Sequence, residues 1–180
     1  MLKKSLFTVA LAVSCAAMLL CTTGCSLFKK GSRARVNTLM VSGNYLQPRL
    51  LCEIAQFHTH QPVLLFNPAD EENPKPAFYY LSPDQKGEQF SPEQFYEMVE
   101  HLNPRVVVFM GDNTYYPTEV ITEELRENYR VMQLGSTNWE KNAMMLGDIL
   151  GQGDRLFKEY AEYYEKFLKA PDKQADIPQK

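Results

Sequence analysis

The side chains best suited to chemistry lie in three short polar turns, and each turn directly follows a predicted strand. These turns are Ser42-Gly43-Asn44, Gly111-Asp112-Asn113-Thr114 and Gly135-Ser136-Thr137-Asn138. In open parallel sheets, ligands bind beyond the carboxyl ends of the strands, and free backbone N–H groups at a helix start can receive anionic or hydroxyl-rich ligands. The candidate ligand-binding residues are therefore Asn44, Asp112, Asn113, Ser136, Thr137 and Asn138.

The same residue types are also common in ordinary turns and helix caps. Thr137 and Glu140 have the spacing of a capping box. A single aspartate in the position of Asp112 is more often a cap or turn former than a catalytic acid. The sequence therefore leaves two interpretations of these turns open, as a ligand site and as plain turn chemistry.

Catalytic patterns are sparse. Asp112 is the best single acid, because it follows a strand that we expect to be buried. His58 and His60 are two residues apart at a predicted helix end, so they do not share a helix face and do not suggest a metal pair. The sequence lacks a nucleophile elbow, a Walker loop, a Cys-x-x-Cys pair and a dinucleotide-binding glycine motif. These observations favour a non-enzymatic protein without catalytic residues, cofactor or metal, and the alternative is an enzyme that uses Asp112 with His58 or His60.

Strands and helices that alternate along the chain are predicted to position the three turns. The predicted strands are residues 36–42, 62–66, 77–81, 105–110 and 130–134. The predicted helices are one that starts near Pro48 and has Leu50, Leu51, Ile54 and Phe57 on its apolar side, and residues 91–102, 117–128 and 138–150. Residues 67–90 form a loop-rich excursion that holds only the strand 77–81. This order predicts an α/β domain over residues 36–151, with a mostly parallel, doubly wound (Rossmann-like) sheet and helices on both faces.

A last helix is predicted for residues 154–169, after the break at Gly151-Gln152-Gly153 and with Asp154 as its cap. Its aromatic stripe consists of Phe157, Tyr160, Tyr164 and Phe167. We expect this C-terminal aromatic helix to pack against the sheet domain, and the alternative is an exposed face that binds a partner. Residues 170–180 are rich in Pro, Lys, Asp and Gln and are predicted to be a disordered tail.

The first 25 residues have the layout of a secretory signal that ends at a cysteine. Lys3 and Lys4 precede an apolar run over residues 6–20, which leads to Thr22-Thr23-Gly24-Cys25. The last four residues resemble the lipobox of bacterial lipoproteins, in which the cysteine thiol is acylated and becomes the new N-terminus. The resemblance implies a lipoprotein signal peptide over 1–24, a lipidated tether over 25–35 and a bilayer anchor through acylated Cys25. The alternative is an ordinary secretory signal with an unmodified Cys25.

The charge and the cysteine content argue against a nucleic-acid partner and against an intrachain disulfide. Residues 1–24 hold two of the 19 basic and none of the 22 acidic side chains, so 17 basic and 22 acidic side chains remain, a formal charge of −5. Because a nucleic-acid-binding protein needs a basic face, we expect no nucleic-acid partner. With Cys25 acylated, Cys52 is the one cysteine left after processing, so we expect a buried thiol and no intrachain disulfide.

The region from Val36 to Gly151 resembles one repeat of the bacterial cell wall binding repeat type two family. The matching phrases, in order, are Leu39–Asn44, Pro62–Leu65, Val106–Gly111 with Pro117–Val120, and Val131–Ala143, which includes Leu134-Gly135, Trp139 and Glu140. Members of that family attach surface proteins to envelope polymers, and they normally carry three repeats that pack as a pseudo-trimer. The resemblance implies an envelope-polymer-binding domain that assembles as a homotrimer, pairs with another protein or stands alone.

Together, these features predict a lipid-anchored protein of the bacterial cell envelope, on the periplasmic face of the outer membrane where the source is a diderm. Its α/β domain is expected to bind an envelope polymer or a protein partner without catalysis. The alternatives are a small periplasmic enzyme and an accessory subunit that docks through its aromatic C-terminal helix.

Overall fold

The structure, a computed structural model, describes residues 36–71, 73–82 and 87–168. The predicted signal peptide, the tether with Cys25 and the tail 170–180 lie outside these residues. The described residues form a six-stranded sheet in the order β4-β3-β2-β1-β5-β6. The strands are β1 (Thr38–Gly43), β2 (Val63–Asn67), β3 (Ala77–Leu81), β4 (Gly87–Phe90), β5 (Val106–Met110) and β6 (Arg130–Leu134).

Four neighbouring strands, β2, β1, β5 and β6, run parallel, and β6 forms one edge of the sheet. In β1, Met40 pairs with Val63 of β2 on one side and with Val108 of β5 on the other. All of β1 and the first four residues of β2 are buried, which explains the continuous apolar runs Leu39–Val41 and Val63–Phe66. The prediction of an α/β fold with a mostly parallel sheet is confirmed.

An antiparallel hairpin of β3 and β4 extends the sheet beside β2. The sequence predicted β3 but placed β4 in a loop, and the structure corrects this prediction. In β4, Gly87, Glu88 and Gln89 are exposed and Phe90 alone is buried. With a single buried side chain, β4 shows no alternation of apolar and polar residues from which a strand could be predicted. Its exposed polar residues are typical of an edge strand.

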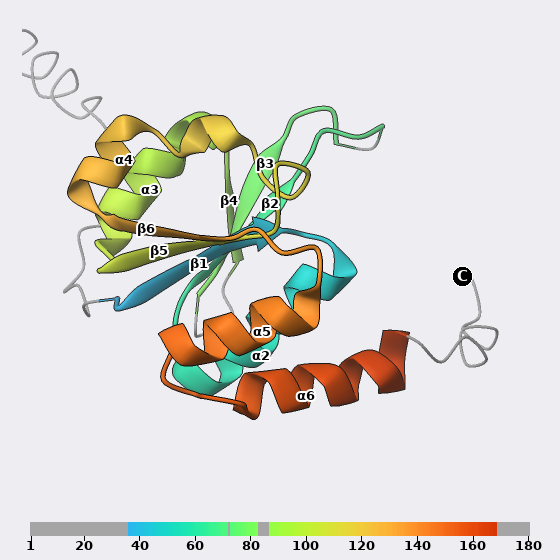
Figure 1. The fold of residues 1–180 in the computed structure, drawn as a ribbon. Coiled ribbons are helices and arrows are strands. Elements are labelled where there is room, and N and C mark those ends of the chain that lie inside the picture. The colour runs from blue at the N-terminus through green and yellow to red at the C-terminus, as the bar shows by residue number, and fades with distance from the viewer. Residues whose placement is uncertain (1–35, 72, 83–86, 169–180) are drawn as a thin grey trace, which may run out of the picture. The chain divides into compact units, whose positions relative to one another are not determined.

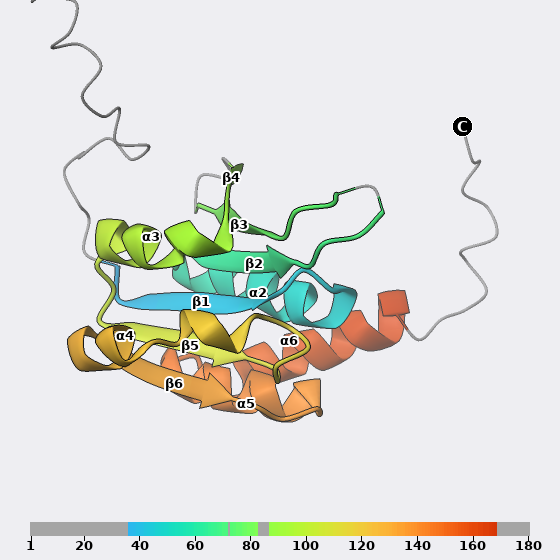
Figure 2. The ribbon, with the colours of Figure 1, turned by 90° about the horizontal axis from the view of Figure 1, so that it is seen from above.

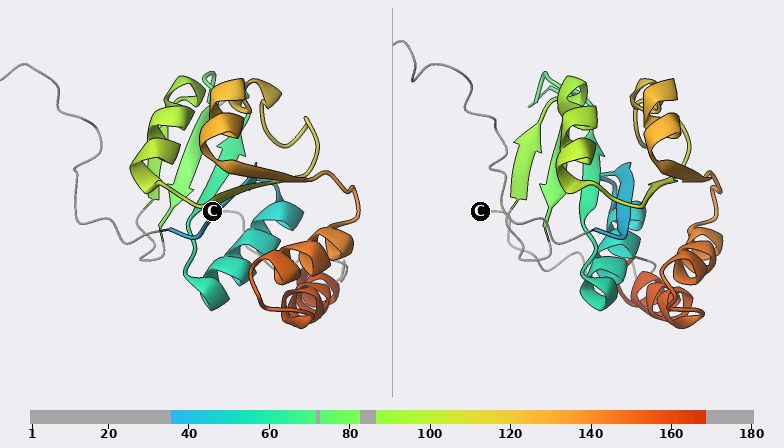
Figure 3. Two further views of the ribbon diagram at one scale, coloured as in Figure 1. Left: turned by 60° about the vertical axis from the view of Figure 1, so that its left-hand side comes forward. Right: turned by 90° about the vertical axis from the view of Figure 1, so that its left-hand side faces the viewer.

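The helices lie on both faces of the sheet (Figure 1). They are α2 (Leu46–Thr59), α3 (Phe95–Leu102), α4 (Glu123–Asn128), α5 (Trp139–Ile149) and α6 (Arg155–Tyr163), which continues as the π-helical turn η4 (Tyr164–Leu168). Helices α3 and α4 cover one face, and α2, α5 and α6 cover the other, as the side views in Figure 3 show. The predicted C-terminal helix corresponds to α6 and η4.

Two helix predictions were wrong in detail. The helix predicted over 117–128 is a short 3-10 helix, η3 (Thr118–Val120), followed by the separate helix α4. The break occurs because the Thr122 hydroxyl accepts the backbone N–H of Leu125 and thereby starts a new helix. In α2, Phe57 was expected on the buried side but is 76% exposed, because its position near the helix end lies beyond the sheet-facing stripe of Leu51, Ile54 and Ala55.

The two faces of the sheet have different cores. The face under α3 and α4 is lined by an aromatic cluster, the residues Phe66, Phe78, Phe90, Phe95, Phe109 and Tyr116, whose neighbouring ring centroids lie 5.0–5.9 Å apart. The face under α2, α5 and α6 is mainly aliphatic and includes Met40, Leu51, Val108 and Leu146. Cys52 belongs to this second core, as predicted, and its burial raises the pKa of the thiol well above the ordinary value.

Candidate functional site

The three predicted turns meet at one edge of the sheet. Because β1, β5 and β6 are parallel neighbours, their carboxyl ends point to the same side (Figure 2). The Ser42 hydroxyl donates to the carbonyl of Met110 at 2.8 Å, which joins the ends of β1 and β5. The Gly111 N–H donates to the carbonyl of Leu134 at 2.9 Å, which joins the ends of β5 and β6. The three turns that carry the candidate residues therefore lie along the same edge of the sheet.

Tyrosine side chains pack against the turns at the ends of β1 and β5. Gly111 has a φ of 95°, and a Cβ there would lie 2.5 Å from the ring of Tyr115. A Cβ at Gly43 would lie 2.7 Å from the ring of Tyr45 and 2.8 Å from the carbonyl oxygen of Tyr115. The two rings meet edge to face at 5.5 Å. The glycines of these turns thus allow tyrosines to pack closely on the strand ends.

Asp112 acts as a turn former. Its carboxylate accepts the backbone N–H of Thr114 at 2.9 Å and the Thr114 hydroxyl at 2.6 Å. These bonds, the hydroxyl first, hold the pKa of Asp112 below its ordinary value, so the group is an ionised acceptor. His58 and His60 lie at the other end of α2, which leads to the start of β2 and so to the opposite edge of the sheet. The structure therefore does not bring Asp112 together with either histidine.

His58 instead connects α2 to α6. Its Nε2 lies 2.6 Å from a carboxylate oxygen of Glu159, and the His58 side chain is only 6% exposed. The other carboxylate oxygen of Glu159 pairs with Arg155 at 3.2 Å. The hydrogen bond from His58, followed by that from Arg155, lowers the pKa of Glu159. An ionised carboxylate can only accept, so the histidine nitrogen donates.

This contact predicts a pH-dependent contribution to stability. We expect Glu159→Gln to lower the melting temperature by roughly 2–5 °C at neutral pH, because a hydrogen bond to a charged group is lost. A carboxyl whose folded pKa is depressed stabilises the fold above its unfolded pKa, and this contribution is lost as the pH falls through the folded value. The difference from wild type should therefore shrink below the ordinary value of 4.5. Melting curves at several pH values test this, with the exposed Glu162→Gln on the same helix as control, and an unchanged difference at pH 3 would contradict it.

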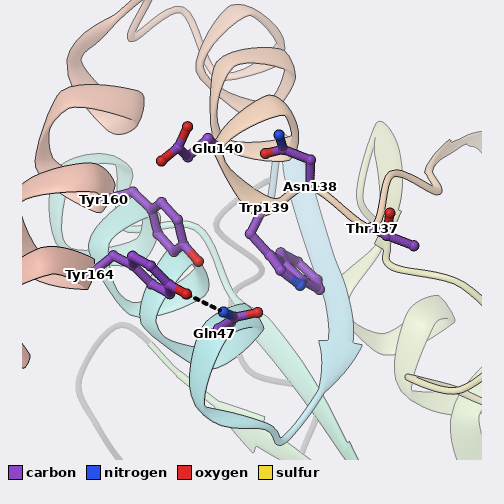
Figure 4. A pocket seen from close by; sticks show the side chains of 7 residues that line it. All are labelled: Gln47, Thr137, Asn138, Trp139, Glu140, Tyr160 and Tyr164. Carbon is purple, nitrogen blue, oxygen red and sulfur yellow. Dashed lines mark hydrogen bonds between the residues drawn. The ribbon is translucent and has the colours of Figure 1, made fainter. Parts of the chain in front are cut away.

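A pocket opens beside these turns, between α2, α5 and α6 (Figure 4). We call it the Tyr160 pocket, and its volume is about 260 Å³. It is lined by Gln47, Thr137, Asn138, Trp139, Glu140, Tyr160 and Tyr164. Gln47 comes from the first turn of α2, Thr137 and Asn138 from the turn before α5, and Trp139 and Glu140 from the first turn of α5. The two tyrosines come from α6 and η4.

The hydroxyl of Tyr160 is the unusual group of the pocket. Tyr160 is 1% exposed, and its oxygen is buried without a hydrogen-bond partner among the described residues. Figure 4 shows it pointing between Trp139 and Gln47, whose Nε2 donates to the Tyr164 hydroxyl at 3.1 Å. Burial is the main cause that raises the pKa of Tyr160, and the nearby Tyr164 and Glu140 raise it further. The phenol therefore stays protonated. A buried polar group without a partner costs roughly 1–3 kcal/mol, which a ligand here would offset.

The predicted site residues are divided by the structure. Thr137 and Asn138 line the Tyr160 pocket, but Asn138 is the helix cap, since its side chain accepts the N–H of Lys141 at 3.1 Å. The prediction that Thr137 caps this helix is therefore wrong, because the N-cap is the next residue, Asn138. The Ser136 hydroxyl accepts the N–H of Asn138 at 3.1 Å and shapes the same turn. Asn113 is exposed in the loop after β5.

Asn44 leads into a second depression, which has a volume of about 380 Å³ and is lined by Tyr45, Leu46, Gln47, Pro48, Thr114 and Tyr115. The Asn44 side-chain oxygen is buried and has no partner among the described residues. Gln47 lines both hollows, and Tyr115 contacts Trp139 edge to face at 5.1 Å. The two depressions therefore adjoin each other along the carboxyl edge.

Five of the seven lining residues were not predicted to bind a ligand, namely Gln47, Trp139, Glu140, Tyr160 and Tyr164. The two tyrosines belong to the aromatic stripe, which was expected to pack against the sheet domain, with an exposed partner-binding face as the alternative. The aromatic stripe of α6 divides in the structure, because Tyr160 is buried whereas Phe167 is 61% exposed. The stripe was the available signal, but nothing local indicated that two of its tyrosines would face the start of α5.

Comparisons with protein-family models, with curated protein sequences and with solved structures gave no match for this chain. Among residues 36–71, 73–82 and 87–168, no helix is both long and apolar enough to cross a membrane. In the same ranges, no group of three or more His, Cys, Asp or Glu side chains is placed to hold a metal ion.

Proposed function

We propose that this chain is a lipoprotein of a bacterial cell envelope, anchored through acylated Cys25, whose α/β domain binds an envelope polymer without catalysis. The lipobox-like sequence Thr22-Thr23-Gly24-Cys25 supports the anchor. In a diderm source the protein faces the periplasm from the outer membrane. The resemblance to the cell wall binding repeat supports a polymer ligand, and it makes a homotrimer the proposed assembly.

The Tyr160 pocket is the observation that carries the binding function. It lies at the carboxyl edge of a mostly parallel sheet, where ligands of such folds bind. Aromatic walls with a few convergent polar groups are typical of ligand sites. The unpartnered Tyr160 hydroxyl gives a ligand a polar group to bond. A binding role without catalysis is supported by Asp112, which is held in a turn far from His58 and His60.

We also propose that the four parallel strands form a doubly wound, Rossmann-like core to which the β3–β4 hairpin is added. The strand order β2-β1-β5-β6 supports this, because the chain moves from β1 to one side of the sheet and then crosses to the other. The helix between β1 and β2 and the helix between β5 and β6 lie on opposite faces. Such a reversal places a crevice at the carboxyl ends of β1 and β5, next to the Tyr160 pocket.

Cosedimentation with purified cell-wall sacculi tests the binding function. Thr137 is exposed and lines the pocket, so an arginine at this position adds a large cationic side chain to the pocket wall. We expect Thr137→Arg to weaken sedimentation of the full-length protein by more than about tenfold, which corresponds to about 1.4 kcal/mol of binding free energy.

Gln89→Arg is the matched control, because it introduces the same side chain and charge at an exposed position of β4. It should sediment like the wild type. The proposal fails if the wild-type protein does not sediment with the sacculi above the level of a sacculus-free sample, or if both variants bind equally well.

A further inference from the structure

The charge and ring content of the Tyr160 pocket indicate what kind of group it receives. Three of its seven lining residues are aromatic, Trp139, Tyr160 and Tyr164. Its one charged lining residue is Glu140, and none of the lining residues is basic. Aromatic rings attract cations through the negative potential of their faces, and a carboxylate adds to this attraction. The lining therefore favours a positively charged group over an anion.

The Tyr160 hydroxyl adds a built-in acceptor to these walls. Its residue is more than nine-tenths buried, its oxygen has no partner among the described residues, and it points into the pocket (Figure 4). The Tyr164 oxygen already accepts a hydrogen bond from Gln47. A ligand that brings N–H donors would satisfy the Tyr160 oxygen, which a hydrophobic ligand would leave unpaired.

The two arginines and the helix N-terminus that could bind an anion do not serve this pocket. Arg49, on the first turns of α2, pairs with Glu53 at 2.7 Å. Arg105 precedes β5 and so lies at the opposite edge of the sheet. At the start of α5, the Asn138 side chain accepts the Lys141 N–H, and Glu140 in the first turn offsets the positive end of the helix dipole.

We infer that the Tyr160 pocket recognises an organic ammonium group, held between the rings of Trp139, Tyr160 and Tyr164, with Glu140 as counter-ion and the Tyr160 hydroxyl as hydrogen-bond acceptor. This inference rests on the proposed binding function for its biological setting, in which the ligand is an envelope polymer that carries free amino groups. Its pocket chemistry can be tested without that polymer.

The test uses methylammonium chloride, tetramethylammonium chloride and neutral tert-butanol as probes of the full-length protein in detergent. Trp139 is the single tryptophan of the chain and lies in the pocket wall, so its fluorescence reports occupancy directly. We expect saturable changes with both ammonium salts and none with tert-butanol or sodium chloride. Saturation by tert-butanol as strong as that by the cations, or no saturation by either cation, would overturn the inference.

Two variants separate the roles of the groups. Glu140→Gln should weaken the binding of both ammonium probes by roughly three- to fivefold, as expected for the loss of one exposed charge. Glu127→Gln on α4, on the other face of the sheet, makes the same charge change and should leave both affinities within about twofold. Equal effects of the two variants would contradict a counter-ion role.

Tyr160→Phe keeps the ring but removes the hydroxyl. This variant should weaken the binding of methylammonium by roughly three- to tenfold. The affinity for tetramethylammonium, which has no N–H group, should stay within about twofold of the wild-type value. A purely structural tyrosine would affect both probes alike, and that result would overturn the assigned role. If the probes bind as expected but the sacculi do not, the ammonium site stands and the proposed polymer function fails. If Thr137→Arg abolishes sacculus binding while no cation binds, the polymer function stands and the ammonium site fails.

Discussion

Cys25→Ser is expected to move the protein from the membrane fraction to the soluble fraction almost completely. Acyl chains contribute about 0.8 kcal/mol for each buried methylene, so the two or three chains of a lipoprotein hold a domain on a bilayer almost permanently. Among the residues that the structure describes, no helix has the length and apolar character needed to cross a membrane. Fractionation of cells, together with incorporation of radiolabelled palmitate, measures the effect.

Cys21→Ser is the matched control, since Cys21 lies four residues before Cys25 within the segment predicted to be removed. It should leave palmitate labelling and membrane association unchanged. The intact mass of the wild-type product should also differ from that of the serine variant by more than the substitution itself. Equal masses, apart from the substitution itself, would refute acylation at Cys25 and would leave an ordinary secretory signal as the explanation.

The parallel strands could be predicted from the sequence because they have a local signal. Residues 106–110 are a short apolar run, residues 130–134 contain three apolar side chains, and each segment is followed by a glycine; the structure has strands there. The edge strand β4 lacked this signal. Only one of its four residues is buried, so its sequence shows no alternation of apolar and polar residues. The break between η3 and α4 was missed for a similar reason, because one threonine hydroxyl decides it.

The candidate site was only partly predictable. The polar turns could be placed at the carboxyl edge, because parallel strands bring their ends together. The Tyr160 pocket depends instead on how α6 packs against α2, and this packing involves contacts such as that between Gln47 and Tyr164, which are 117 residues apart. Such long-range contacts leave no local pattern in the sequence. The aromatic stripe indicated a buried helix face, but not that part of this face would line a cavity.

Phe78→Ala is expected to cause a large loss of stability, measured as the free energy of unfolding. Phe78 is completely buried, and its ring lies 5.0–5.7 Å from those of Phe66, Phe90 and Phe95. It therefore joins β2, the β3–β4 hairpin and α3. Removing a buried phenylalanine costs about 3–5 kcal/mol, a large part of the 5–15 kcal/mol that stabilises an ordinary domain. Urea denaturation followed by Trp139 fluorescence, in the soluble Cys25→Ser background, measures the loss.

Phe57→Ala provides the control, because it makes the same chemical change at a phenylalanine that is 76% exposed. The sequence pattern placed Phe57 on the buried side of α2, whereas the structure places it in solvent beside His58, with ring centroids 5.0 Å apart. We expect a change within about 0.5 kcal/mol for this variant. A loss as large as that of Phe78→Ala would mean that Phe57 is covered in solution, by a second copy of the chain or another partner, since an exposed ring leaves no cavity when it is removed.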